Sequence, residues 1–169
     1  MRVTSLEAVV RALNDAGVRF LIAGGVAVNA HGYLRFTADI DLVVALDPAN
    51  VSAAFGAFGQ LGYRPTIPVT GAQFADADTR KEWIEHKGMK VLGFFSDRHR
   101  ETTIDVFVEM PFTFDDEYGK ALVEEMAPGV PASFVALPTL IKMKESAARP
   151  RDQDDVHHLR WILEDQQDG

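Results

Sequence analysis

The chain has 169 residues, a length that fits one domain, and its 47% hydrophobic content is typical of a folded globule. It contains no cysteine, which excludes disulfides, thiolate zinc sites and cysteine nucleophiles. The formal net charge of −8 disfavours a broad nucleic-acid surface, leaves room for a local basic groove, and suits a divalent cation held by clustered carboxylates.

The ends and the hydropathy of the chain give expectations about its location. The N-terminal residues follow a charged amphipathic pattern, and no apolar run approaches the roughly 18 residues that span a bilayer. We therefore expect a soluble, cytoplasmic protein with no membrane partner. We expect a single domain over residues 1–169, with a core of about 1–137 and a C-terminal helical segment of about 138–165.

The first half of the chain alternates helix and strand signals. Apolar residues at helical spacing predict a helix through Leu6 and Leu13 that Gly17 closes. A helix start is also predicted at Asp47-Pro48, an N-cap followed by a first-turn proline. The remaining elements of this half are a buried strand, a short helix, a β-branched strand and a longer helix, predicted over residues 18–23, 26–32, 40–46 and about 48–59.

The second half predicts, in chain order, a loop over 65–71, a short helix within 74–85, strands over 91–96, 102–108 and 134–137, and two final helices. The charged turn 97–100 joins the first two of these strands and predicts an antiparallel hairpin. Pro138 opens the first of the final helices, Pro150 ends it, and the second fades into a polar tail over 164–169. The pattern predicts an α/β fold, with a small mixed β-sheet flanked by α-helices and C-terminal helices.

A glycine pair, Gly24-Gly25, lies between a predicted strand and a predicted helix. Backbone N–H groups without a neighbouring Cβ can approach a phosphate closely, and the helix N-terminus adds its dipole. A tight turn with no ligand is the alternative.

Three aspartates lie in predicted strands, which usually exclude this residue. Asp39 and Asp41 are two residues apart, so their carboxylates project from one face; Asp105 shares its face with Thr103 and Phe107. Adjacent carboxylates repel one another unless a cation lies between them, and Mg²⁺, with Mn²⁺ as a substitute, is the natural candidate. Taken singly, each could instead be a solvated acid on an exposed or edge strand.

The order of strand, Gly-Gly, helix, Asp-x-Asp strand and later Asp strand resembles the DNA polymerase β-type nucleotidyltransferase superfamily. Within it, the chain looks most like the AbiEii-like and minimal nucleotidyltransferases of prokaryotes. Residues 24–41, with the lead-in Arg-x-Thr-x-Asp-x-Asp, carry the resemblance together with residues 140–155, and residues 63–90 match least. The family often has Gly-Ser where this chain has Gly-Gly, which removes a possible hydroxyl contact to phosphate.

The resemblance implies an enzyme that moves a nucleoside monophosphate from a nucleoside triphosphate (NTP) to an acceptor hydroxyl and releases pyrophosphate. Asp39 and Asp41 would hold Mg²⁺ on the triphosphate. Asp105 would bind a second metal and help to deprotonate the acceptor hydroxyl. Catalysis would depend mainly on positioning and charge neutralisation.

The resemblance also implies a set of phosphate contacts, namely Gly24, Gly25, Arg35, Thr37 and Lys144. Lys144, with Arg149 and Asp152 beside it, would face the phosphates or brace the site. A surface charge or a local ion pair is the alternative for each of these three. Asp155 is a candidate structural partner for a basic residue.

The acceptor is open between a tRNA 3′ end, a protein side chain and a small molecule such as an aminoglycoside. Resemblance to toxin-like members favours tRNA or protein and implies a toxin–antitoxin system with a cognate partner. The alternative from another class is a catalytically silent nucleotide-binding or antitoxin-like member. An α/β domain whose three acids have no shared role is a third interpretation.

Overall fold

The computed structural model describes residues 1–169 and contains one mixed sheet of seven strands in the order β3-β4-β5-β2-β1-β7-β6. The strands are β1 (Phe20–Ala23), β2 (Asp39–Val44), β3 (Tyr63–Pro65), β4 (Val91–Ser96), β5 (Thr103–Phe107), β6 (Leu122–Ala127) and β7 (Val130–Phe134). The pairs β2–β5 and β1–β7 are parallel, and the others are antiparallel. The predicted mixed α/β architecture is confirmed.

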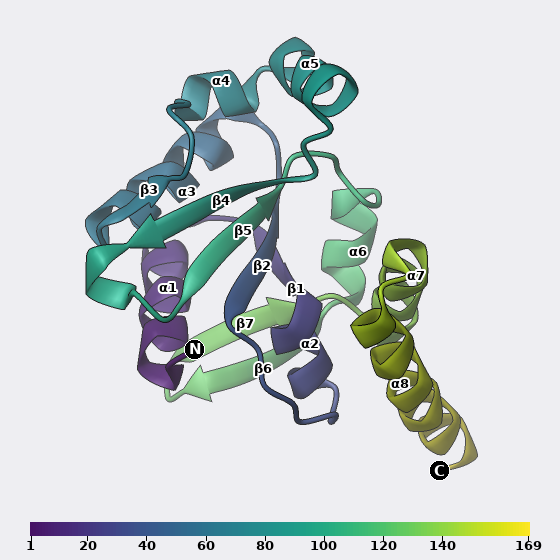
Figure 1. Cartoon of the computed structure of the whole chain (residues 1–169). Coiled ribbons are helices and arrows are strands. Elements are labelled where there is room, and N and C mark those ends of the chain that lie inside the picture. The colour runs from purple at the N-terminus through teal and green to yellow at the C-terminus, as the bar shows by residue number, and fades with distance from the viewer.

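Helices lie on both sides of this sheet (Figure 1). They are α1 (Val3–Asp15), α2 (Gly24–Ala30), α3 (Pro48–Gln60), α4 (Gly71–Ala75), α5 (Ala77–Lys87), α6 (Phe114–Lys120), α7 (Leu137–Ala147) and α8 (Pro150–Asp168). Helices α1 and α3 pack on one face, α2 packs against β1 and β2, and α7 and α8 form a pair beside α2. None of the helices combines the length and apolarity that a membrane crossing requires.

The central strands bury one face completely and leave the other partly open. In β2, Ile40 and Leu42 have no exposed surface, and in β5, Ile104 and Val106 are at most 1% exposed. These side chains join the main hydrophobic core. The alternate residues of β2 and β5 point to the opposite face, because successive side chains of a strand alternate. Asp39, Asp41 and Asp105 lie on that partly open face.

Several local predictions are confirmed. Strands β4 and β5 form the predicted antiparallel hairpin, joined through the short 3₁₀ turn η1 (Asp97–His99). The N-cap of α3 is Asp47, whose carboxylate accepts a hydrogen bond from the Asn50 N–H at 3.1 Å. Pro150 separates α7 from α8 as predicted, and it occupies the first turn of α8.

Two predictions near the C-terminus are wrong. The strand predicted over 134–137 lies at 130–134, because Ala136 is already the N-cap of α7 and Pro138 occupies the first turn of that helix. The polar tail predicted over 164–169 is helical through Asp168, since it contains no residue that breaks a helix before Gly169.

The middle of the chain holds elements that were not predicted, namely β3, α6 and β6. The loop predicted over 65–71 is flanked by β3 and α4, and the helix predicted within 74–85 is divided into α4 and α5 at Asp76. Strand β6 is an edge strand with three consecutive exposed residues, so it lacks the apolar alternation of a half-buried strand.

Candidate active site

Three aspartates meet on the partly open face of the sheet. Strands β2 and β5 run parallel with Asp41 directly opposite Asp105, so the two carboxylates lie on neighbouring strands at the same level. Asp39 lies two residues earlier on the same face of β2, opposite Thr103, whose hydroxyl donates a hydrogen bond to the Asp39 carboxylate. The parallel register of β2 and β5 therefore brings the three predicted carboxylates together.

Burial and mutual repulsion weaken the acidity of this cluster. Burial, together with the charges of Asp105 and Asp39, raises the pKa of Asp41 to about 7. Burial and the charge of Asp39 also raise the pKa of Asp105. A group with a raised pKa binds a proton more readily than usual, so the cluster is short of positive charge. A bound cation would neutralise this negative charge.

The donor set of this cluster fits Mg²⁺, since every donor is a carboxylate oxygen and Mg²⁺ is usually held by one or two carboxylates plus phosphates and water. No three acidic or histidine side chains converge on one metal position in this conformation. Asp41 and Asp105 are the pair that the register places side by side, with Asp39 at the edge of the cluster.

The glycine turn adjoins this cluster. Gly24, the first residue of α2, has a φ of +60°, and a Cβ atom there would collide with the carboxylate of Asp41. A Cβ atom on Gly25 would lie 2.6 Å from Oγ1 of Thr37 and 3.0 Å from a terminal nitrogen of Arg35. Both glycines are therefore required by close approach of the neighbouring side chains.

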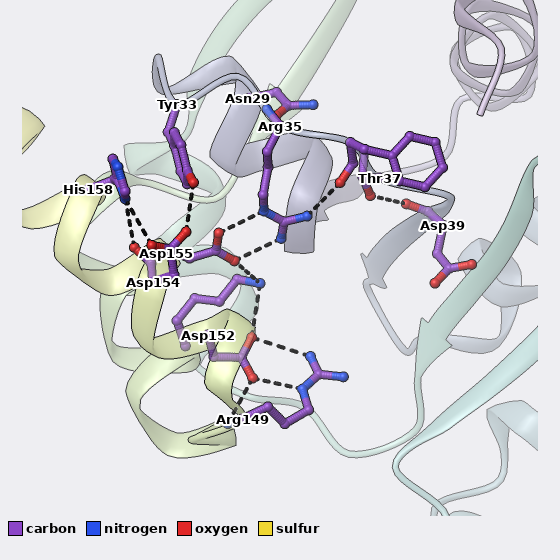
Figure 2. A network of polar contacts seen from close by, with 12 residues as sticks. Asn29, Tyr33, Arg35, Thr37, Asp39, Arg149, Asp152, Asp154, Asp155 and His158 are labelled. Atoms are coloured by element: carbon purple, nitrogen blue, oxygen red, sulfur yellow. Dashed lines mark hydrogen bonds and ion pairs between the residues drawn. The ribbon is translucent and has the colours of Figure 1, made fainter.

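The loop of residues 31–38, which leads into β2, is fastened to the C-terminal helices (Figure 2). The hydroxyl of Tyr33 donates to Asp154 at 2.6 Å, and the Tyr33 ring stacks on His158 with centroids 3.9 Å apart. Nε2 of His31 is 2.8 Å from the carbonyl oxygen of Val135. Helix α8 thus holds the segment that presents Asp39.

A buried ion network lies beside the loop (Figure 2). Arg35 donates two hydrogen bonds of 2.7 Å to Asp155, whose side chain has no exposed surface. Nζ of Lys144 lies 3.0 Å from Asp155 and 3.2 Å from Asp152, and the Lys144 side chain is 8% exposed. Arg149 donates to Asp152 at 2.7 Å through Nε. The network connects α7, α8 and the loop of residues 31–38.

The network also reaches the acidic cluster electrostatically, because the charges of Lys144 and Arg149 act to lower the pKa of Asp41. Of the predicted phosphate contacts, Gly24 lies against Asp41, and Gly25 lies against Thr37 and Arg35. Arg35 and Lys144 are held by carboxylates of α8.

Sequence reasoning did not assign Thr103 to the site; it predicted Asp155 as a partner for a basic residue, which is confirmed, but did not identify Arg35 as that residue. The alternation of β5 placed Thr103 on the same face as Asp105, which is a signal that could have identified it. The pairing of Asp155 with Arg35 joins residues 120 apart in the chain, so local sequence gives no signal for it.

Comparisons with known proteins place the fold. No protein-family model matches the chain, and no curated protein matches its sequence. Among solved structures, the chain is similar to the antibiotic-resistance factor ANT(2'')-Ia, an aminoglycoside nucleotidyltransferase studied in solution. The similarity covers 98% of this chain and 92% of that chain, with 14% sequence identity and a TM-score of 0.56. At this identity the comparison establishes a nucleotidyltransferase fold.

Proposed function

We propose that the protein is a Mg²⁺-dependent nucleotidyltransferase, which moves a nucleoside monophosphate from an NTP to an acceptor hydroxyl. The observation that carries the proposal is the direct pairing of Asp41 and Asp105 on parallel strands, with Asp39 on the same face, in a chain with a nucleotidyltransferase fold. The raised pKa values of Asp41 and Asp105 support a cation at this position.

The aspartates and the glycines have different roles in the proposed transfer. Asp39, Asp41 and Asp105 would hold Mg²⁺, which when bound neutralises charge on the triphosphate and on the departing pyrophosphate. Asp105 accepts the proton of the acceptor hydroxyl, whose oxygen forms a bond to the α-phosphorus while the bond from that phosphorus to the bridging oxygen of pyrophosphate breaks. The backbone of Gly24, which lies against Asp41, and that of Gly25 would contact phosphate oxygens.

A second candidate function is nucleotide binding without transfer, as in a catalytically silent or antitoxin-like protein. The observation that favours it is that three ligands do not converge on one metal position in this conformation. The two candidates differ in chemistry: both bind an NTP, but only the first releases pyrophosphate.

The acceptor classes follow from the proposed chemistry. A tRNA 3′ end, a protein side chain and an aminoglycoside each offer a hydroxyl, and the structural similarity to ANT(2'')-Ia supports including the last. The resemblance to toxin-like members extends the proposal to a toxin–antitoxin pair, in which expression of the active enzyme alone would arrest growth.

The test is pyrophosphate release from each of the four NTPs with Mg²⁺, in the presence of tRNA, cell protein or aminoglycosides. We expect release with at least one pair of substrates, and a loss of about 10³-fold or more in Asp39→Asn/Asp41→Asn, since a missing electrostatic contact in a transition state costs several kcal/mol. The exposed Asp97→Asn is the matched control and should retain full activity. Binding without release would support the silent alternative, and equal release by the double variant would refute the site.

A further inference from the structure

The three cations of the ion network differ in how many of their donors are free. Arg35 uses Nε and one terminal nitrogen on Asp155 and the other terminal nitrogen on the carbonyl of Phe36, and its side chain is 13% exposed. Lys144 is 8% exposed and lies between two carboxylates. Both side chains are therefore largely shielded from solvent.

Arg149 is the exception. Its side chain is 72% exposed, although Nε and one terminal nitrogen donate to Asp152 at 2.7 and 3.3 Å. A guanidinium has five N–H donors, so one edge is held by Asp152 while the remaining terminal nitrogen keeps both of its donors free. In Figure 2 this guanidinium points away from α8, toward the side on which Asp39 lies.

Asp152 is held in turn. Its side chain has no exposed surface and accepts from Lys144 at 3.2 Å and from the backbone N–H of Arg149 at 3.2 Å. Arg149 is also the N-cap of α8, so its backbone is fixed at the start of that helix. The guanidinium therefore projects from a rigid base and loses little conformational entropy when it binds a ligand.

The charge balance of the network points in the same direction. Arg35, Lys144 and Arg149 supply three positive charges against the two negative charges of Asp152 and Asp155, which leaves one positive charge over. The hydrogen bond and charge of Asp152 raise the pKa of Arg149, and the charge of Asp41 adds to this effect, so Arg149 lies within electrostatic reach of the acidic cluster. Arg149 nevertheless forms no ion pair with Asp41.

From this geometry we infer that Arg149 binds the β- and γ-phosphates of the NTP, and that Asp152 and Lys144 are positioning residues that orient its guanidinium. A planar guanidinium with two free donors matches the geometry of phosphate oxygens. Lys144 instead donates to Asp152 and so helps to fix the carboxylate that orients the guanidinium. The inference rests on the proposed function and assigns the polyphosphate contact to a residue on α8.

The test is calorimetric binding of Mg²⁺–NTP and of the corresponding nucleoside monophosphate to the wild type and to Arg149→Ala. We expect Arg149→Ala to weaken NTP binding by about 10- to 100-fold, the range for a charged hydrogen bond, with less than about threefold change for the monophosphate. Arg149→Lys keeps the positive charge but loses the paired N–H donors, so its NTP affinity should lie between those of the wild type and Arg149→Ala. The matched control is Arg151→Ala, an exposed arginine two residues along α8 that forms none of the ion pairs and should bind like the wild type.

A structural role alone would lower the unfolding midpoint of Arg149→Ala without changing the preference for NTP over monophosphate. That preference is therefore the decisive readout. If the wild type binds Mg²⁺–NTP and Arg149→Ala binds it equally well, or loses both ligands equally, the assignment of Arg149 is wrong and the proposed function stands. If the wild type binds no Mg²⁺–NTP, the proposed function fails and this assignment fails with it.

Discussion

A half-buried pair of aspartates in the sheet and a fully buried pair in α8 lie close together in this protein, and their pKa values shift in opposite directions. In the sheet, burial raises the pKa of Asp41 and Asp105, and neighbouring carboxylates raise it further. In α8, burial acts to raise the pKa of Asp152 and Asp155, but hydrogen bonds from Arg149, Arg35 and Lys144 outweigh it and lower the pKa.

The two groups of aspartates differ in whether the chain itself supplies their cations. The aspartates of α8 have their cations built into the chain, so the network is complete and holds the loop of residues 31–38 in place. The aspartates of the sheet are ordered by strand register without a paired cation; under the proposed function, Mg²⁺ bound with the nucleotide would supply that cation. Removing a carboxylate from the α8 network should therefore destabilise the folded protein. Removing one from the sheet cluster should instead relieve charge repulsion and stabilise the metal-free protein.

The largest expected effect is in the network. Asp155→Ala leaves Arg35 and Lys144 buried without that partner, and breaking a buried pair in this way costs about 3–5 kcal/mol of unfolding free energy. The measurement is urea unfolding at neutral pH. The control is Asp154→Ala, whose exposed contacts are expected to be worth about 1 kcal/mol or less. Equal losses in the two variants would show that the network does not stabilise the fold.

The second prediction concerns Asp41, whose replacement should raise rather than lower the stability of the metal-free protein at neutral pH. Because the pKa of Asp41 is about 7 in the folded protein, the folded state binds more protons than the unfolded state between about pH 4 and 7. Stability from this group is present in full below the unfolded pKa and is lost as the pH rises to about 7, by roughly 2–4 kcal/mol in the absence of Mg²⁺.

Asp41→Asn should remove this decline and make the metal-free protein more stable than the wild type above pH 7. Urea unfolding in EDTA at several pH values between 5 and 8 measures both slopes. Parallel slopes for the two proteins would mean that Asp41 does not titrate as the cluster requires. The variant should still fail in nucleotidyl transfer, so stability and activity change in opposite directions.

The smallest effect concerns the space beside Asp41. Gly24→Ala introduces a Cβ that forces the Asp41 carboxylate aside, in addition to left-handed backbone strain of about 1–2 kcal/mol. Gly88→Ala is the matched control, because Gly88 has almost the same φ, +61°, and open space around it. We expect a larger loss of stability in Gly24→Ala than in Gly88→Ala, because only the former adds a collision to the backbone strain, and a loss of transfer activity of about tenfold or more only in Gly24→Ala. Full activity of Gly24→Ala would show that Gly24 is not part of the active site.

Much of the site could be predicted because its parts follow from local rules. The spacing of Asp39 and Asp41 fixed their common face, and the glycine pair marked the turn that begins α2. The pairing of Asp41 with Asp105 was beyond local rules, since it depends on the parallel register of β2 and β5, whose connection contains two further strands.

The omission of β6 from the predicted fold has a physical cause. The hairpin of β6 and β7 turns at Pro128-Gly129, where Gly129 has a φ of +76°, and this turn signal outweighs the polar composition of β6. Hydrophobic periodicity detects strands that bury one face, so it missed this exposed edge strand. The network of α8 was predicted in part, as Arg149 and Asp152 beside Lys144 and Asp155 as a partner for a basic residue, but the pairing with Arg35 was not, because it joins α8 to the loop of residues 31–38.

The most direct test of the account is calorimetric binding of each NTP to the wild type and to Asp39→Asn/Asp41→Asn, with Mg²⁺ and with EDTA. We expect the wild type to bind at least one NTP only with Mg²⁺, and the double variant, although folded, not to bind it. Binding that persists in the double variant, or that is the same in EDTA, would contradict the claim that these aspartates form the metal–nucleotide site.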